Sequence, residues 1–211
     1  MVDAWTGLRD TSTGEPWERD TTAMAWSTTK GVTSAALHLV VQRGALDYDD
    51  LVADHWPEFA AGGKATTTVR HVLTHEAGLH DIRSLIPDAR AMLDHDTIAA
   101  ALAQAEPAYE PGTASGYHAL TYGSLVDELV RRTTGDTLAD LVRREIAEPL
   151  GLDGFAIGTA TTSADAPAPP PRTPRLESRY PRDGRSRRRQ PTTRPAWSSD
   201  SRRPSTPTTA R

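Results

Sequence analysis

The sequence predicts an α+β fold that is rich in helices and is followed by a disordered C-terminal tail. Apolar residues recur at helical spacing in several segments between residues 32 and 147. Residues 1–30 alternate only weakly between apolar and polar, which suits one short strand. Residues 161–211 contain ten of the sixteen prolines and few large apolar side chains. Such a segment buries too little apolar surface to offset the entropy lost on ordering, so we expect no structure there.

The charge distribution divides the chain at the same place. Residues 161–211 carry twelve arginines, no lysine and four acidic residues, which gives a net charge of +8. The whole chain carries −4, so residues 1–160 carry −12. We therefore predict a folded domain over residues 1–160 and a disordered Arg/Pro-rich tail over residues 161–211.

Two hypotheses account for the composition of the tail. It is made largely of Arg, Pro, Ser, Thr and Ala, without Lys, Ile, Val or Phe, as a GC-rich coding region gives when translated in a wrong frame. A frameshift near codon 160 is the hypothesis that we favour. A genuine tail would instead bind polyanions weakly and in a salt-sensitive way, through counterion release. Because it has little aromatic interleaving, we expect no specific nucleic-acid binding.

The helices are predicted from the spacing of apolar residues and from signals at the helix ends. The strongest signal starts at Val32, where apolar residues at i, i+3, i+4, i+7 and i+8 form one stripe that ends at Gly44. Four further helices follow, most of them bounded by a capping residue, a glycine or a proline. They are expected at residues 68–78, 96–105, 125–135 and 137–149, with Gly78, Gly135 and Pro149 as stops.

The composition excludes several classes of chemistry. The chain has no cysteine, which removes disulfides, thiol nucleophiles and Cys-based metal sites, so any covalent chemistry uses oxygen or amine nucleophiles. The N-terminus lacks the basic and apolar stretches of a secretory signal. The longest charge-free helical stretch, Gly31–Gln42, is twelve residues, too short to span a membrane. We expect the chain to be soluble and cytoplasmic.

The segment Ser27-Thr28-Thr29-Lys30 lies where the first helical stripe begins. Residues three apart on a helix share a face, so the Ser27 hydroxyl and the Lys30 amine are expected to meet. A serine becomes a nucleophile when a neighbouring base takes its proton, and a desolvated lysine can serve as that base. The alternative is structural: Ser27 caps the helix and Lys30 is solvated.

A second titratable oxygen, the phenol of Tyr117, lies on a loop at the entrance of a later helix. It belongs to a set of five motifs: Trp26-Ser27-Thr28-Thr29-Lys30-Gly31, Val72-Leu73-Thr74-His75-Glu76-Ala77-Gly78-Leu79, Pro111-Gly112-Thr113, Tyr117-His118-Ala119 and Pro149-Leu150-Gly151-Leu152. With these motifs in this order, the chain resembles the serine hydrolases related to class C β-lactamases, especially the family VIII carboxylesterases. The resemblance covers roughly residues 5–158, and its Ser-x-x-Lys motif carries the nucleophile.

The resemblance implies roles for three side chains. Ser27 would be the acylated nucleophile, with Lys30 and Tyr117 managing its proton, and either of these two would be the base. The backbone N–H of Ser27 would form half of an oxyanion hole. In the β-lactamase branch the tyrosine motif usually ends in Asn, whereas this chain has Ala119 at that position. This departure favours ester over lactam hydrolysis, with β-lactamase or D-alanyl-D-alanine peptidase activity as a further alternative.

One motif of the family is absent. A Lys-Thr-Gly or His-x-Gly-like strand is expected downstream, but the only lysines, Lys30 and Lys64, are not followed by Thr-Gly, and no histidine has Gly two positions on. In the family fold the sheet is built from strands at both chain ends, with the helical lobe inserted between them. The resemblance therefore implies the helix-rich lobe of a β-lactamase/transpeptidase-like fold, with an incomplete antiparallel sheet, in a truncated chain.

The histidines suggest one competing site. His71 and His75 are spaced i, i+4 on a predicted helix, which invites a zinc site. A zinc-protease motif requires a second histidine where this chain has Leu79, and Gly78 interrupts the helix, so we expect no metal site. We expect the His75 imidazole to hydrogen-bond to backbone in a packed turn beneath the site.

The function predicted from the sequence is that of a serine hydrolase of the carboxylesterase or β-lactamase type. It would act on short acyl esters through a Ser27 acyl-enzyme. No cofactor is expected, since protein groups supply the nucleophile, the base and the oxyanion donors. The expected partner is a small-molecule ester, and the oligomeric state is not predicted by the sequence. The alternative is a catalytically inactive truncated fragment or a non-enzymatic binding remnant.

Overall fold

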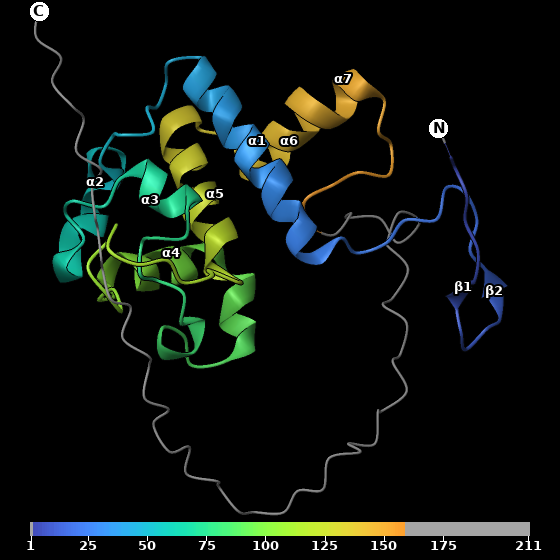
Figure 1. Ribbon diagram of the computed structural model, residues 1–211, viewed down its shortest axis with the longest axis horizontal. Coiled ribbons are helices and arrows are strands. Elements are labelled where there is room, and N and C mark those ends of the chain that lie inside the picture. Colours follow the sequence, from blue (N-terminus) through green and yellow to red (C-terminus); the bar gives the residue numbers. More distant parts are fainter. Residues whose placement is uncertain (1, 159–211) are drawn as a thin grey trace, which may run out of the picture. The chain divides into compact units, whose positions relative to one another are not determined.

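Helices and one small antiparallel sheet make up the described structure. A computed structural model describes residues 2–158 (Figure 1). The predicted domain end at residue 160 and the predicted tail over residues 161–211 lie outside the described residues. Within residues 2–158, the helices and the two-stranded sheet confirm the predicted helix-rich α+β class. No helix in this described part is both long enough and apolar enough to cross a membrane.

The sheet is a short hairpin near the N-terminus. Strand β1, Leu8–Asp10, pairs antiparallel with β2, Glu15–Pro16. In the turn between them, the Asp10 carboxylate accepts the backbone N–H of Ser12 at 2.7 Å, and Gly14 has a φ of 75°. The prediction of a single strand in this region was wrong. The turn reverses the chain into a second strand of two residues, which is too short to produce an alternating pattern.

Helices α1 and α5 lie side by side at the centre of the core (Figure 1). A 3-10 turn, η1, covers Trp26–Thr28 and continues into α1, Thr29–Gln42, so this helix begins before the predicted start. Helix α5, Thr121–Thr134, ends where Gly135 adopts a left-handed φ of 80°, which confirms that stop. The apolar residues that the two helices bury are Ala36, Leu37, Val40, Tyr122, Leu125, Val126, Leu129 and Val130.

Shorter elements surround these two helices. They are α2 (Val52–His55), η2 (Pro57–Gly63), α3 (Val69–Leu73), η3 (Ile82–Ser84), η4 (Ala89–Leu93) and α4 (His95–Gln104). Helix α4 agrees with the prediction to within one residue at each end. The largest side chains buried in this part of the core, Trp56 and Phe59, pack against each other with ring centroids 5.0 Å apart.

Helix α3 starts as predicted but ends early. The Thr68 hydroxyl accepts the backbone N–H of His71 at 3.2 Å, which caps the helix. The predicted stop at Gly78 was wrong, because the helix ends at Leu73. His75 takes a left-handed φ of 65°, which no helix can continue through, and Gly78, with a φ of 73°, lies in the turn that follows.

The C-terminal helical segment is interrupted. Thr137 caps α6, Leu138–Val142, as predicted, and a π-helical turn, η5, covers Arg143–Ala147. Pro149 was predicted to end the helix, and this was wrong. It lies in a final short helix, α7 (Glu148–Leu150), at one of the first two positions, where proline is tolerated. Gly151, with a φ of 64°, ends that helix.

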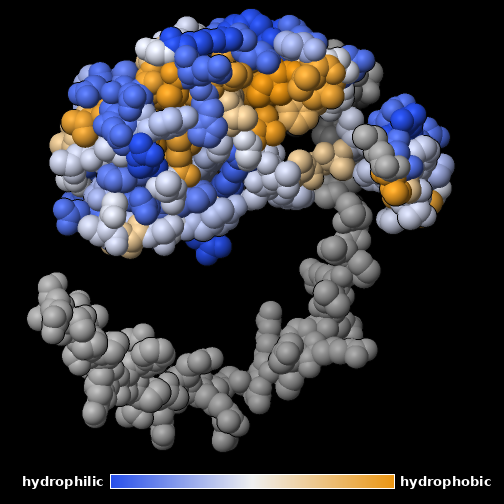
Figure 2. Space-filling view, turned by 45° about the horizontal axis from the view of Figure 1, so that its top comes forward, coloured by the Kyte–Doolittle hydropathy of each residue, from blue (hydrophilic) through white to orange (hydrophobic). Residues whose placement is uncertain are grey.

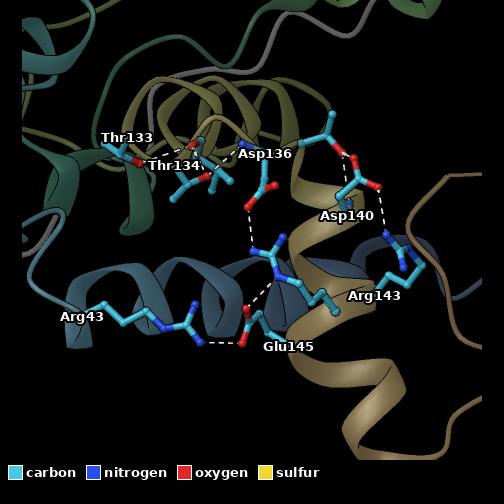
Figure 3. Close-up of polar contacts among 10 residues, drawn as sticks. Arg43, Thr133, Thr134, Asp136, Asp140, Arg143 and Glu145 are labelled. Atoms are coloured by element: carbon cyan, nitrogen blue, oxygen red, sulfur yellow. Dashed lines mark hydrogen bonds and ion pairs between the residues drawn. The ribbon is translucent and has the colours of Figure 1, made fainter.

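Charged side chains join the end of α1 to η5 (Figure 3). Glu145 accepts hydrogen bonds from Arg43 at 2.5 Å and from Arg144 at 2.9 Å, and Arg144 also pairs with Asp136 at 2.6 Å. The two guanidinium groups lower the pKa of Glu145 to about 2. Exposed ion pairs contribute little to stability, so this network orients η5 against the end of α1 more than it stabilises the fold. Elsewhere on the surface, hydrophobic residues gather in patches between hydrophilic ones (Figure 2).

A fully buried lysine ties η2 to the end of α4. Lys64 is 0% exposed, and its ammonium donates to the carbonyl oxygens of Ala61 at 2.7 Å, Ala103 at 3.1 Å and Ala105. Three acceptors satisfy all three donors of the ammonium, which makes its burial tolerable. Burial still lowers the pKa of Lys64. Gly62 is required beside it, because a Cβ there would lie 2.5 Å from the carbonyl oxygen of Ala105.

We predict that Lys64→Met lowers the free energy of unfolding by about 2–4 kcal/mol, because it leaves buried carbonyl groups without a donor. Arg90→Met, at an exposed position of η4, is the matched control and should change stability by less than about 0.5 kcal/mol. Urea denaturation followed by circular dichroism measures both. A Lys64→Met protein as stable as its control would contradict the structural role given to this ammonium.

Candidate active site

The start of α1 brings Ser27 and Lys30 together. Lys30 Nζ donates to Ser27 Oγ at 3.2 Å and to the carbonyl oxygen of Ala119 at 2.7 Å. Ser27 is exposed and Lys30 is partly buried. The hydroxyl therefore faces solvent while the amine lies between two segments of the chain. The structure places the hydroxyl and the amine within hydrogen-bond distance, as the i, i+3 spacing predicts.

Tyr117 lies beside Lys30, next to the start of α1. Its side chain is 55% exposed, and Lys30 Nζ lies 4.9 Å from the centroid of its ring. The Ser27 hydroxyl, followed by the Lys30 amine, lowers the pKa of the Tyr117 phenol through hydrogen bonding. All three residues predicted from the sequence therefore meet, and an exposed hydroxyl has an amine and a phenol beside it.

A contact between α1 and α5 fixes the backbone beneath these groups. The Ser34 hydroxyl donates to the carbonyl oxygen of Lys30 at 2.9 Å and lies 2.7 Å from the Tyr122 hydroxyl. Tyr122 is 2% exposed, and burial raises the pKa of its phenol. Neither residue belongs to the motifs that predict the site from the sequence. The one available signal was the i, i+4 spacing of Ser34 from Lys30, which is too common to single out a residue.

The turn after α3 packs under Tyr117. His75 Nδ1 accepts the backbone N–H of His118 at 3.2 Å, which confirms that this imidazole hydrogen-bonds to backbone. Burial first, and the charge of Lys30 second, lower the pKa of His75. Gly78 allows the turn to approach its neighbours, because a Cβ there would lie 2.8 Å from the Cβ of Pro107.

The buried ring of His118 holds the loop that carries Tyr117 through hydrogen bonds to the backbone. Its side chain is 0% exposed, its Nε2 accepts the backbone N–H of Leu79 at 3.0 Å, and its Nδ1 lies 2.6 Å from the carbonyl oxygen of Gly116. These partners require a neutral ring with its proton on Nδ1. Burial is the main cause that lowers the pKa of His118 to about 4. Nothing in the sequence marks His118 beyond its place in the Tyr117-His118-Ala119 motif, because burial is not visible in a single sequence.

The histidines of the competing zinc hypothesis have other partners. His71 Nδ1 accepts the backbone N–H of Thr68 at 3.3 Å as part of the cap of α3, and His75 accepts from His118. Across residues 2–158, no three or more histidine, aspartate or glutamate side chains are grouped as metal ligands.

Comparisons with known proteins agree on one family. The profile of the Beta-lactamase family matches residues 1–199. Over 167 residues, 79% of this chain and 38% of the relative, the chain is 43% identical to "Esterase/beta-lactamase LipL" of Mycobacterium tuberculosis. A solved family VIII carboxylesterase is similar with a TM-score of 0.73 and 37% identity, over 78% of this chain and 45% of that one.

A second solved structure, a penicillin-binding protein homologue from Caulobacter crescentus, is similar with a TM-score of 0.69 and 42% identity. That match covers 77% of this chain and 43% of the other. The chain therefore spans less than half the length of each of these three proteins.

The neutral His118 makes the stability of the fold depend on pH. In the unfolded chain this residue takes up a proton near its ordinary pKa of 6.5, whereas in the folded protein its pKa is about 4. The stability is thus fully present above pH 6.5 and is lost as the pH falls toward 4, because the unfolded state binds the proton first. We expect a loss of roughly 2–3 kcal/mol across this window, measured by urea denaturation.

His118→Asn and His38→Asn form a matched pair for this measurement, since His38 is exposed. The His118 variant should be less stable at neutral pH and should lose less stability as the pH falls. The His38 variant should keep the slope of the wild type. Equal slopes in all three proteins would contradict the assignment to His118.

Proposed function

Because the chain belongs to the Beta-lactamase family, we propose that it is a serine hydrolase that acts on short acyl esters through an acyl-enzyme at Ser27. The family membership confirms the resemblance seen in the sequence motifs. The name of one relative combines esterase and beta-lactamase, and a solved relative is a carboxylesterase. Esterase is the term that the two descriptions share, and it supports the choice of an ester substrate.

The observation that carries the proposal is the contact of Lys30 Nζ with Ser27 Oγ at 3.2 Å, beside the phenol of Tyr117. An exposed serine hydroxyl with two proton-accepting groups next to it is the arrangement that nucleophilic catalysis requires. Ser27 also lies in the first turn of the continuous helical segment that η1 and α1 form. Backbone N–H groups in a first turn lack helical acceptors, and the helix dipole favours negative charge there, so both stabilise an oxyanion.

In the proposed acylation step, Ser27 Oγ attacks the carbonyl carbon of the ester while its proton passes to Lys30 Nζ or Tyr117 Oη. The tetrahedral intermediate then collapses, the bond from the carbonyl carbon to the alkoxy oxygen breaks, and the alcohol leaves with that proton. Water next adds to the acyl-enzyme and gives a proton to the same base. Collapse of this second intermediate releases the carboxylic acid and returns the proton to Ser27.

The environment of Tyr117 supports its part in proton transfer. A hydroxyl and a cation beside a phenol favour the phenolate, and the pKa of Tyr117 is lowered for this reason. A base is most effective when its pKa approaches the working pH, and the shift is in that direction. The role of Lys30 depends on which group is the base: as the base it takes the Ser27 proton as a neutral amine, and beside a Tyr117 base it is the cation that favours the phenolate.

Exposed apolar side chains next to site residues in the sequence support an acyl ester as the substrate class. Trp26 is 69% exposed and Leu120 is 52% exposed, and each is close in sequence to a site residue. They offer apolar surface to a short acyl chain. Ala119 provides no side-chain amide to bind a lactam or a peptide, which supports ester over lactam hydrolysis.

We predict a burst of p-nitrophenol from p-nitrophenyl butyrate on the purified protein, close to one equivalent, together with a butyryl mass adduct. Ser27→Ala should show neither, because it lacks the nucleophile. Thr28→Ala, which removes a neighbouring exposed hydroxyl, should keep both. Stopped-flow absorbance and intact-protein mass spectrometry provide the two readouts.

An adduct that forms equally on Ser27→Ala would show that another group is acylated and would refute the proposal. A folded wild-type protein with no burst and no adduct would favour the inactive fragment or the binding remnant. Turnover of the chromogenic cephalosporin nitrocefin at a rate comparable to the ester would instead favour the β-lactamase alternative.

A further inference from the structure

His75 has an unusual backbone for its residue type. Within residues 2–158, only Trp26 and His75 take a positive φ without being glycine, at 49° and 65°. Trp26 immediately precedes the proposed nucleophile. A left-handed conformation in a residue with a Cβ is uncommon and costs about 1–2 kcal/mol, so it persists only where its surroundings compensate. The contacts of His75 show which interactions compensate for the cost of its left-handed backbone.

The backbone on both sides of Tyr117 is bound by His75. The N–H of Gly116 donates to the carbonyl oxygen of His75 at 3.0 Å, and the N–H of His118 donates to its Nδ1 at 3.2 Å. The Tyr109 hydroxyl donates to the same carbonyl oxygen at 3.2 Å. One residue thus accepts the N–H groups of both neighbours of Tyr117.

The ring of His75 also lies against the aromatic side chains of the site. Its centroid is 5.0 Å from the Tyr117 ring, at 58°, and 4.9 Å from the Tyr122 ring, at 43°. These tilted contacts are of the kind that gives aromatic pairs a preferred geometry. Tyr122 is itself bound to α1 through Ser34. The imidazole therefore connects the Tyr117 ring to the packed part of the fold.

We propose that His75 is a positioning residue that fixes Tyr117 beside Ser27 and Lys30. It acts through the loop, by accepting the two backbone N–H groups that flank Tyr117 and by packing on its ring. This inference rests on the proposed function of Ser27 and extends it by one residue.

The role requires a neutral imidazole. Nδ1 accepts the N–H of His118, so the ring proton is on Nε2, and a second proton on Nδ1 would oppose that N–H. The titratable groups around the ring are Lys30 from α1, Tyr122 from α5, and Tyr117 and His118 from the loop. Burial and the charge of Lys30 both disfavour the imidazolium, which lowers the pKa of His75 and preserves the acceptor.

Three substitutions separate the acceptor from the backbone strain. Asparagine tolerates a left-handed φ, and its Oδ1 occupies the position of the histidine Nδ1, so His75→Asn keeps the hydrogen bond to His118. Glycine removes the strain and the acceptor together, and alanine removes the acceptor and keeps the strain. If the backbone turn alone mattered, His75→Gly would behave at least as well as His75→Asn.

The experiment measures two quantities in the wild type and the three variants. One is the pKa of the Tyr117 phenol, from the ultraviolet absorbance of phenolate, with Tyr117→Phe identifying the contribution of this tyrosine. The other is the rate of acylation of Ser27 by p-nitrophenyl butyrate. A merely structural role for His75 would change the unfolding midpoint but would leave the Tyr117 pKa of the folded protein in place.

We expect His75→Asn to retain the lowered Tyr117 pKa and to acylate within about threefold of the wild type. His75→Gly and His75→Ala should show a Tyr117 pKa closer to its ordinary value and acylation slower by roughly 10- to 100-fold, because the phenol moves away from Ser27 and Lys30. A Tyr117 pKa that is the same in all four proteins would overturn the inference, whether or not they acylate.

A His75→Gly protein that matches the wild type in both quantities would likewise overturn it. If the wild type shows no acylation, the titration alone decides: a lowered Tyr117 pKa in the wild type and His75→Asn, but not in the other two, supports the positioning role. In that case the proposed function fails while the inference about Tyr117 stands.

Discussion

The hydrogen bond from Lys30 Nζ to the carbonyl oxygen of Ala119, at 2.7 Å, joins two segments that are 89 residues apart in the sequence. It directs the amine so that Ser27 Oγ lies 3.2 Å away. The bond depends on the packing of α1 against α5, where Ser34 and Tyr122 meet at 2.7 Å. The Ser-x-x-Lys motif alone therefore does not form the site. Its spacing places two groups on one helix face, and the packing of α1 against α5 brings the third group, the carbonyl oxygen of Ala119, to Lys30.

The imidazoles behind the site are arranged to avoid positive charge. Burial lowers the pKa of His118 to about 4, and burial together with Lys30 lowers the pKa of His75. Both rings are thus neutral near neutral pH, and each has a nitrogen that accepts a backbone N–H group. In the proposed mechanism this leaves Lys30 to act on the phenol of Tyr117 without competing cations behind it.

Structural features that depend on residues close together in the chain could be predicted from the sequence. Apolar periodicity located α1, α4 and α5 to within a few residues, since each helix buries one continuous stripe. It could not show the early end of α3, because the left-handed His75 is stabilised by partners more than thirty residues away. Lys64 gave no signal for the same reason, since two of its three carbonyl partners come from the end of α4, 39 and 41 residues along the chain. The meeting of Ser27 with Lys30 was predictable from spacing alone, whereas the contribution of the loop around His118 was not.

Activation of Ser27 by the Lys30 amine is tested by labelling the protein with a fluorophosphonate, which reacts with activated serines, followed by peptide mapping. We expect a label on Ser27 alone, formed slowly or not at all in Lys30→Met, which removes the amine. Labelling of Ser27 at the same rate in Lys30→Met, or labelling spread over many serines, would contradict this activation and show that the contact between amine and hydroxyl does not make Ser27 a nucleophile.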